Sequence, residues 1–298
     1  MVLMSPSLRL QLEPAWGGGL VRFDWIANGA SVPLMRPYEP DTPSSGAPDP
    51  NRLACYPLVP WSNRISGGGF FVDDVRIEVP RNREDEPWPI HGTGWQRVWQ
   101  VERCSDNAAR LMLDETWGAY RYRASLDYAL RDEVLDVVLS ATNTSSSTLP
   151  FGLGLHPFFP RHDGVRLTAP AHGVWLNDGR TPLPVARAAV PARWNFGREA
   201  ELPDGLDHCF DGWAGRGLIH WPHRQLHLEL VADVGRYIVY TPAGGDFFCF
   251  EPVDHGIDAA NLPGGGAANG MSLLAPGQAL TRRFSFRAKA AASSAGGP

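Results

Sequence analysis

A glutamate stands at the end of a short apolar run in the last sixth of the chain. Residues 247–250 read Phe-Phe-Cys-Phe, and Glu251 follows them directly. This run predicts a strand buried on both faces, and Pro252 is expected to end it because proline lacks a backbone donor. A carboxylate in such a place is costly to bury. Glu251 is therefore either a general base with a raised proton affinity or the partner in a structural salt bridge or turn cap.

A histidine lies within a second unusual stretch, residues 149–160, which reads LPFGLGLHPFFP. As a strand, this stretch places three apolar side chains on one face and Gly152, Gly154 and His156 on the other. Glycines at alternate strand positions often mark the close approach of a ligand or of another backbone. The pattern therefore predicts either a flat space beside His156 or tight packing against another strand, with His156 a core histidine.

Three shorter motifs add polar side chains that could hold a substrate. Asn63 and Arg64 precede a Gly-rich turn and could offer a fork of donors to a polyol, although an arginine that ties a loop to a carboxylate is the commoner explanation. His91 lies in a Gly-rich turn, where we expect it to face a cleft or solvent. Asp207 and His208 lead into an apolar segment.

Histidines at 220, 223 and 227 raise the alternative of a metal site. Pro222 and the surrounding β pattern exclude helical spacing of these side chains. On one strand only His223 and His227 would share a face, about 13 Å apart at roughly 3.3 Å per residue, which is too far for one ion. We therefore predict no metal site. The sequence also lacks the P-loop, dinucleotide-binding, zinc-protease and nucleophile-elbow motifs.

The elements that must position these residues are short strands separated by turns. The predicted strands or hairpins are 8–13, 20–25, 70–79, 98–101, 109–113, 120–130, 133–143, 149–155, 165–168, 217–221, 226–231, 237–240 and 279–286. We find no amphipathic helix longer than two turns. The pattern predicts an all-β protein, a large two-sheet antiparallel β-sandwich. It forms one domain over residues 1–287, and residues 288–298 are expected to be a disordered tail.

Composition and charge limit the classes of molecule that we expect this protein to bind. The net charge is −5 and no basic block stands out, so we expect no nucleic-acid partner. The four cysteines are widely spaced, which does not suggest a disulfide scaffold. We see neither a signal peptide nor an apolar run of membrane-spanning length, so we expect no membrane partner and a cytoplasmic location. Most of the eleven tryptophans are expected in the core, and both a monomer and a homodimer stay open.

Several of these motifs occur together in an order that resembles the aldose 1-epimerase (galactose mutarotase-like) family. The resemblance covers roughly residues 8–287 and implies a single-domain β-supersandwich. The segments that carry it are Asn63-Arg64-Ile65, His91-Gly92, Leu155-His156-Pro157-Phe158, Asp207-His208, Glu251-Pro252 with Asp258-Ala-Ala-Asn261, and the strand start Leu274-Ala-Pro-Gly277.

The resemblance implies a role for each matching residue. His156 would be the general acid toward the ring oxygen of a sugar, and Glu251 would be the base that takes the anomeric proton. His91 would help to hold the ring-oxygen side. Arg64, with Asn63 beside it, and Asp207 would bind sugar hydroxyls. The resemblance also implies a small-molecule sugar as partner and no cofactor.

This chemistry interconverts the α and β anomers of an aldose by opening and closing the ring. We expect the imidazole and the carboxylate to face each other across a pocket the size of one sugar ring, with a pKa near or above neutrality for His156. The alternatives are a hexose-phosphate epimerase relative, a non-catalytic sugar-binding protein on the same fold, and a glycoside hydrolase or lyase. Departures from the family pattern around His156 and Glu251 leave the sugar open.

Overall fold

The period-two runs of the sequence fold into two large antiparallel sheets. The computed structural model describes residues 1–27, 29–39, 48–162 and 164–290. In these residues the larger sheet has eleven strands. Ten of them follow one another across the sheet, and the eleventh, β4 (Ala30–Pro33), pairs with β3. The spatial order is β1 (Val2–Met4), β2 (Leu8–Glu13), β3 (Gly19–Ala27), β5 (Cys55–Leu58), β13 (Gly154–Pro160), β22 (Phe247–Val253), β21 (Arg236–Thr241), β18 (Leu206–Asp211), β15 (Gly173–Asn177) and β16 (Pro184–Ala188).

The second large sheet has nine strands in the described residues. Their order is β17 (Ala200–Glu201), β14 (Arg166–Thr168), β19 (Arg216–Trp221), β20 (Leu226–Ala232), β24 (Ala279–Ala290), β11 (Val134–Asn143), β10 (Tyr120–Arg131), β9 (Ala108–Trp117) and β8 (Gln100–Cys104). Two small sheets pair β12 (Leu149–Phe151) with β23 (Ser272–Leu274) and β6 (Gly69–Val72) with β7 (Val75–Glu78). The helices are α1 (Gly265–Ala268) and the 3-10 turns η1 (Pro50–Arg52), η2 (Ser66–Gly68), η3 (Gly94–Gln96), η4 (Ala192–Trp194) and η5 (Pro222–Arg224).

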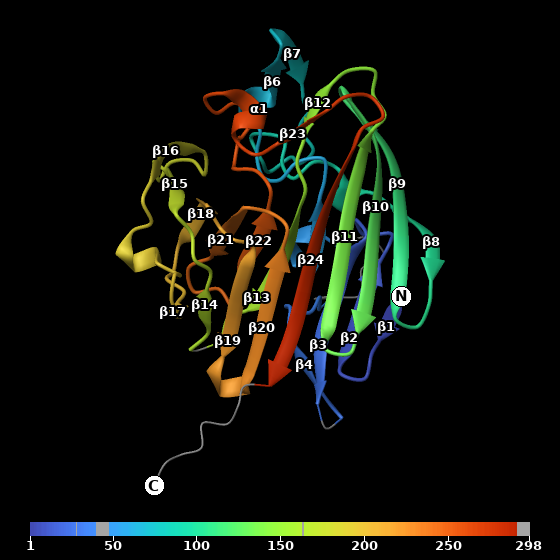
Figure 1. Cartoon of the computed structure of the whole chain (residues 1–298), viewed down its shortest axis with the longest axis vertical. Coiled ribbons are helices and arrows are strands. Elements are labelled where there is room, and N and C mark those ends of the chain that lie inside the picture. Colours follow the sequence, from blue (N-terminus) through green and yellow to red (C-terminus); the bar gives the residue numbers. More distant parts are fainter. Residues whose placement is uncertain (28, 40–47, 163, 291–298) are drawn as a thin grey trace.

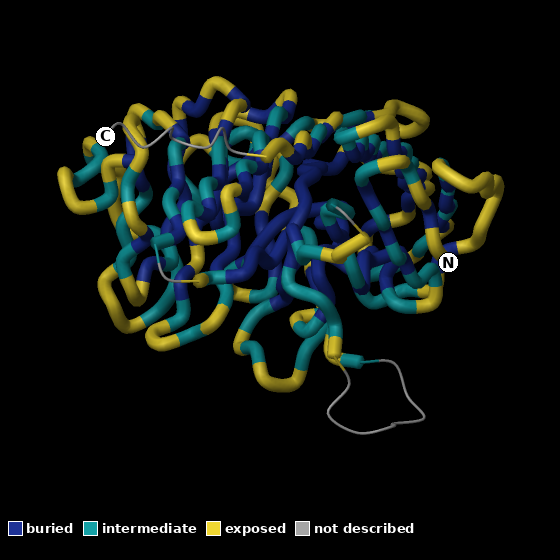
Figure 2. Tube along the Cα trace, turned by 90° about the horizontal axis from the view of Figure 1, so that it is seen from below, coloured by how far each residue is buried: buried dark blue, intermediate teal, exposed yellow. Residues whose placement is uncertain are grey.

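The two large sheets pack face to face, so the predicted β-sandwich is confirmed (Figure 1). Strands β24 and β11 lie in front of β3 and β13, and the main apolar core fills the space between the layers. Buried backbone occupies the centre of the molecule, and exposed residues gather on the loops around it (Figure 2). Five of the eleven tryptophans are buried, and four others are partly buried and pack against the apolar clusters, so most of them contribute to the core as predicted. The buried ones are at 61, 95, 99, 213 and 221, and the partly buried ones at 25, 117, 175 and 194.

The central strands of the larger sheet are buried on both faces, because loops cover the side that does not meet the second sheet. Successive side chains of a strand point to opposite faces. In β22, Phe248 and Phe250 join the core between the sheets, whereas Cys249 joins a second, smaller apolar cluster on the outer face. Tyr56 and Phe158 belong to the same outer cluster. The outer face of this sheet is therefore a second packed surface.

Two strand boundaries differ from the prediction. Pro252 does not end β22: it lies opposite Tyr237, and the next pair, Val253 with Arg236, continues the ladder. Proline removes only its own donor, and strands on both sides hold this segment in place. The predicted strand 149–155 breaks in two, because Phe151 pairs with the short β23 whereas Gly154 begins β13 in the large sheet.

The glycines before His156 serve packing, so of the two alternatives left open by the sequence the structure supports tight packing and not a flat space beside the imidazole. A Cβ atom on Gly152 would lie 1.9 Å from Cδ2 of His255. On Gly154 it would lie 2.8 Å from the carbonyl oxygen of Pro252. Both distances are shorter than real contacts, so the neighbouring chain approaches the bare backbone directly.

The C-terminal boundary and one early strand also shift. Residues 288–290, predicted as the start of the disordered tail, belong to β24, where Ala288 is buried opposite Leu228. The rest of the predicted tail lies outside the described residues. The strand predicted at 98–101 begins later, as β8 (Gln100–Cys104). No helix in the described part of the chain is long and apolar enough to span a membrane.

Candidate active site

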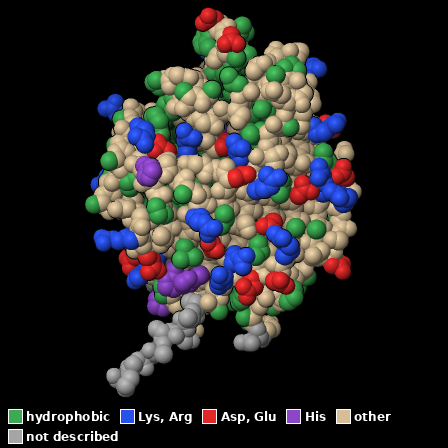
Figure 3. All heavy atoms as spheres, in the orientation of Figure 1, with side chains coloured by type: hydrophobic (Ala, Val, Ile, Leu, Met, Phe, Trp, Pro, Cys, Tyr) green, Lys and Arg blue, Asp and Glu red, His purple; other side chains and the backbone are tan. Residues whose placement is uncertain are grey.

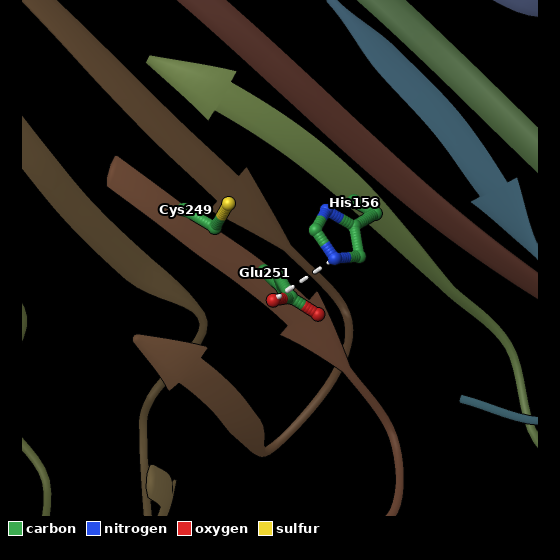
Figure 4. Close-up of side chains that lie close together, drawn as sticks. All are labelled: His156, Cys249 and Glu251. Carbon is green, nitrogen blue, oxygen red and sulfur yellow. Dashed lines mark ion pairs between the residues drawn. The ribbon is translucent and has the colours of Figure 1, made fainter. Parts of the chain in front are cut away.

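His156 and Glu251 come from adjacent antiparallel strands and touch. Gly154 pairs with Val253 and Phe158 with Cys249, so this register sets His156 opposite Glu251. Both side chains point to the outer face of the larger sheet, and Nε2 of His156 lies 3.4 Å from Oε1 of Glu251 (Figure 4). The expectation that a sugar ring separates the two groups is therefore wrong. They form one pair at the bottom of a pocket.

The pocket above this pair has a volume of about 350 Å³. Small-molecule sites in proteins typically measure about 300–1,000 Å³. All six residues singled out from the sequence line it, together with six others. The lining residues are Asn51, Asn63, Arg64, Glu86, Ile90, His91, His156, Phe158, Asp207, Tyr240, Phe247 and Glu251. Segments distant in sequence thus converge on one hollow.

His91 and Asn63 hold each other through two backbone-directed hydrogen bonds. The backbone N–H of Asn63 donates to Nδ1 of His91 at 3.0 Å, and the N–H of His91 donates to the carbonyl of Asn63 at 2.9 Å. Since Nδ1 accepts, a neutral His91 carries its proton on Nε2. Both residues have φ near +60°, a strained conformation that the two bonds maintain. His91 is 5% exposed, so it faces the pocket and not open solvent.

Arg64 fits both interpretations of its motif, a tie between a loop and a carboxylate and a donor to a ligand. Its Nε and Nη2 donate to Oε2 and Oε1 of Glu86 at 2.9 and 2.6 Å, so the arginine does tie its loop to a carboxylate. Both side chains also line the pocket, where their charges offset each other. Asp207, from β18, also lines the pocket. Burial raises the pKa of Asp207, and the Arg64 guanidinium opposes that rise.

Aromatic rings fix the imidazole of His156. The Tyr56 and Phe158 rings each lie with their centroids 4.6 Å from that of His156, tilted by 30° and 23°. Behind Phe158, the Arg36 guanidinium lies 4.2 Å from the Phe158 centroid and 4.3 Å from that of Phe247. Such contacts restrict the ring orientations and exclude water from one side of His156.

Burial favours the neutral forms of both His156 and Glu251. It lowers the pKa of His156 to about 3, which overturns the expectation of a value near or above neutrality. It also raises the pKa of the Glu251 carboxyl well above its usual value, with a further rise from Asp207 and an opposing effect from Arg64. Both shifts favour the uncharged forms of the two side chains, a neutral imidazole and a protonated carboxyl.

The sequence did not predict Glu86, Tyr56 or Phe158 as site residues. Phe158 lies two residues after His156, so strand periodicity alone places it on the same face. Tyr56 sits in a strand interrupted by Pro57, which conceals its β pattern. Glu86 belongs to an irregular segment with no periodic signal.

The histidines at 220, 223 and 227 lie elsewhere. His220 on β19 pairs with His227 on β20, and their ring centroids are 4.1 Å apart. His223 lies in the turn η5 between these strands. Glu199 contacts Nδ1 of His220. The prediction considered one strand only, so it missed that a hairpin brings the first and last histidines together.

Comparison with known proteins agrees with this architecture. A family model described as aldose 1-epimerase matches residues 14–287. The uncharacterized protein YphB of Escherichia coli K12 is 32% identical over 288 residues, covering 93% of this chain and 95% of that protein. The crystal structure of a proposed aldose 1-epimerase from E. coli K12 matches with a TM-score of 0.87 at 31% identity, over 97% of this chain and 98% of that one.

A more distant structure matches in fold. Galactose 1-epimerase from Lactobacillus acidophilus NCFM has a TM-score of 0.77 at 18% identity, over 98% of this chain and 94% of that one. The two sheets and the pocket on the outer face define a galactose mutarotase-like β-sandwich protein. The chain belongs to the aldose 1-epimerase family.

Proposed function

We propose that this protein is a mutarotase that interconverts the α and β anomers of a neutral aldose. The observation that supports this most strongly is the contact between His156 and Glu251 at the bottom of a polar pocket. Opening a cyclic hemiacetal requires a proton on the ring oxygen and removal of the anomeric proton. Both oxygens are bonded to the same carbon, so an acid and a base in contact with each other can reach both.

The single proton of the pair suits a reaction that consumes none. In ring opening, protonated His156 donates to the ring oxygen while ionised Glu251 takes the anomeric proton. The pair then holds its proton on Glu251, which is the form that burial favours. After rotation about one carbon–carbon bond, closure on the other face reverses both transfers. A bound sugar must therefore first draw the proton from Glu251 to His156, across their 3.4 Å contact.

The remaining pocket residues orient the sugar. Burial and the neighbouring His156 lower the pKa of His91 well below its usual value, so His91 stays neutral. Its Nε2–H can donate to the oxygen side of the ring without adding a positive charge. Asp207 accepts from sugar hydroxyls, and Arg64, positioned by Glu86, donates to them. These groups hold the ring in a reactive orientation.

The charges of the pocket favour a neutral sugar over a sugar phosphate. Among the described lining residues the one arginine is already paired with Glu86, and Asp207 and Glu251 add two more carboxyl groups. A phosphate dianion needs unpaired donors, such as a bidentate arginine. The hexose-phosphate alternative is therefore weaker than the free-sugar proposal.

The test is a panel of freshly dissolved single anomers followed by polarimetry or anomeric-proton NMR. The panel contains free aldoses and their 6-phosphates, each measured with and without enzyme. We expect faster equilibration for at least one free aldose and little effect on its phosphate. If no sugar equilibrates faster than in buffer, the protein is a sugar-binding module and not a mutarotase.

A further inference from the structure

One side chain next to the acid–base pair has no part in the proposed reaction. Cys249 lies two residues before Glu251 on β22, so both point to the outer face of the sheet. Figure 4 shows its sulfur beside the His156 imidazole and the Glu251 carboxylate. One nitrogen of His156, the sulfur of Cys249 and one oxygen of Glu251 all lie within 4.8 Å of one another. All three residues are buried.

The donor set is one that zinc prefers. Zn²⁺ binds imidazole nitrogen, thiolate sulfur and carboxylate oxygen at about 2.0–2.3 Å, usually with four ligands in a tetrahedron. Three donors already within 4.8 Å need only small side-chain shifts to reach such bonds. Since His156 and Glu251 line the pocket, an ion can reach the cluster from solvent. The pocket also leaves room for a water molecule as the fourth ligand.

Unpaired polar atoms at the same place are a second, independent observation. Oε2 of Glu251 and Nδ1 of His156 are buried and have no hydrogen-bond partner among the described residues. Buried polar atoms without partners are rare in proteins, and an ion is one of the explanations for them. Glu251 is only 2% exposed. The cluster therefore combines converging ligand atoms with unused coordinating capacity.

We propose that His156, Cys249 and Glu251 bind one Zn²⁺ or a similar thiophilic divalent cation, which blocks the acid–base pair. Binding displaces the thiol proton of Cys249 and the proton shared by the pair. The thiolate and carboxylate then balance the two charges of the ion, so the buried cluster remains neutral. Because the ion occupies the same groups that would act on a sugar, metal and sugar bind in competition.

The metal site is tested by direct binding, without reference to catalysis. Co²⁺ is titrated into the full-length protein carrying Cys104→Ser, since Cys104 is the exposed cysteine. We expect one ion per chain with a near-ultraviolet thiolate charge-transfer band, and displacement of Co²⁺ by Zn²⁺. Adding Cys249→Ser should abolish the band and weaken the affinity for Co²⁺ by at least about 100-fold. Mutating a residue that only supports a metal ligand weakens affinity by up to about 100-fold, so the loss of a ligand should cost at least as much.

Cys209→Ser is the matched control. Cys209 is equally buried and belongs to the same outer cluster, on β18, which β21 separates from β22, but it is not part of the three-residue group. This variant should bind Co²⁺ like the parent. The proposal is overturned if the parent binds no ion, or if Cys249→Ser binds as the parent does.

A spectroscopic measurement covers the case in which Cys249→Ser does not fold. X-ray absorption of the zinc-loaded Cys104→Ser protein should show one sulfur at about 2.3 Å and nitrogen or oxygen at about 2.0–2.1 Å. A first shell without sulfur would refute the site. If the protein proves to be a mutarotase, Zn²⁺ should raise its apparent KM in competition with sugar. A protein that binds the ion but accelerates no sugar would instead refute the proposed function alone.

Discussion

At the scale of single residues, the pair at the bottom of the pocket carries the proposed reaction. Glu251→Gln removes the proton acceptor, and His156→Ala removes its partner. Each change should lower kcat/KM for mutarotation by about 10²–10⁴, the usual contribution of a positioned acid or base. Polarimetry on purified variants measures this loss. Cys209→Ser is the control, because Cys209 is buried on the same outer face but does not line the pocket.

If a variant keeps kcat/KM for mutarotation within a few fold of the parent, the residue that it replaces is not the proposed acid or base. Circular dichroism must first show that each variant is folded. If both single variants lose activity, the double variant should lose little more than the worse of them, because residues that act as one unit are not additive.

The same glutamate should make the folded protein less stable at neutral pH. Burial raises the pKa of Glu251 in the folded chain above its value in the unfolded chain. At a pH between these two pKa values, the folded chain keeps a proton that the unfolded chain has released. Stability therefore falls as pH rises above about 4.3, the ordinary glutamate value. Glu251→Gln has no proton to bind and should melt at a higher temperature than the parent at pH 7.

The advantage of the glutamine variant should shrink as pH falls toward about 4 and vanish below it, where glutamate becomes protonated in both states. Thermal unfolding of both proteins between pH 4 and pH 8 measures this difference. His156 is present in both chains, so its own lowered pKa largely cancels in the comparison. Equal melting temperatures at pH 7 would show that Glu251 is ionised without penalty in the folded state.

At the scale of elements, the break between β12 and β13 depends on a glycine. An alanine at 152 would bring its Cβ into the His255 ring and within 3.0 Å of Oδ1 of Asp254. We expect Gly152→Ala to lower the free energy of unfolding by about 1–3 kcal/mol, as overpacking usually does. Urea unfolding measures the change. Gly256→Ala is the control, because a Cβ there meets nothing within 4 Å.

Comparable stability for the two alanine variants would contradict the packing explanation. It would also revive the interpretation in which the glycine leaves space for a ligand. The distinction matters for the site, since His255 accepts the backbone N–H of Ser62 through Nε2 at 2.9 Å. A displaced His255 would therefore disturb the loop that carries Asn63 and Arg64.

Local patterns predicted the long strands but not how they pair. The alternation in residues 120–143 is uninterrupted, and that hairpin forms as β10 and β11. The strand that supports His156 on its other side, β5, contains Pro57 and shows no such pattern. The contact between His156 and Glu251 is equally invisible in sequence, because it depends on the register of two strands nearly a hundred residues apart.

At the scale of the whole molecule, charge gives no sign of a polyanionic partner. The chain has 27 basic and 32 acidic residues. On the face shown in Figure 3, the two kinds are interspersed over the surface. A nucleic-acid interface usually needs a concentrated basic surface. The charge balance therefore suits a protein whose ligand enters a pocket.

The sandwich also separates the groups that stabilise the fold from those that line the site. The main core lies between the sheets, whereas the pocket lies on the outer face of one of them. Leu139, fully buried on β11, should therefore matter for stability alone. Leu139→Ala should lower the free energy of unfolding by about 2–5 kcal/mol and leave kcat/KM per folded molecule unchanged.

Phe158→Ala is the contrasting variant, because its ring is buried on the outer face against His156. We expect it to lower kcat/KM as well as stability. Urea unfolding and mutarotation, measured on the same preparations, separate the two effects. If Leu139→Ala lowered kcat/KM of the folded protein as much as Phe158→Ala does, the larger sheet would transmit changes between its faces. The site would then depend on the core across the thickness of the sheet.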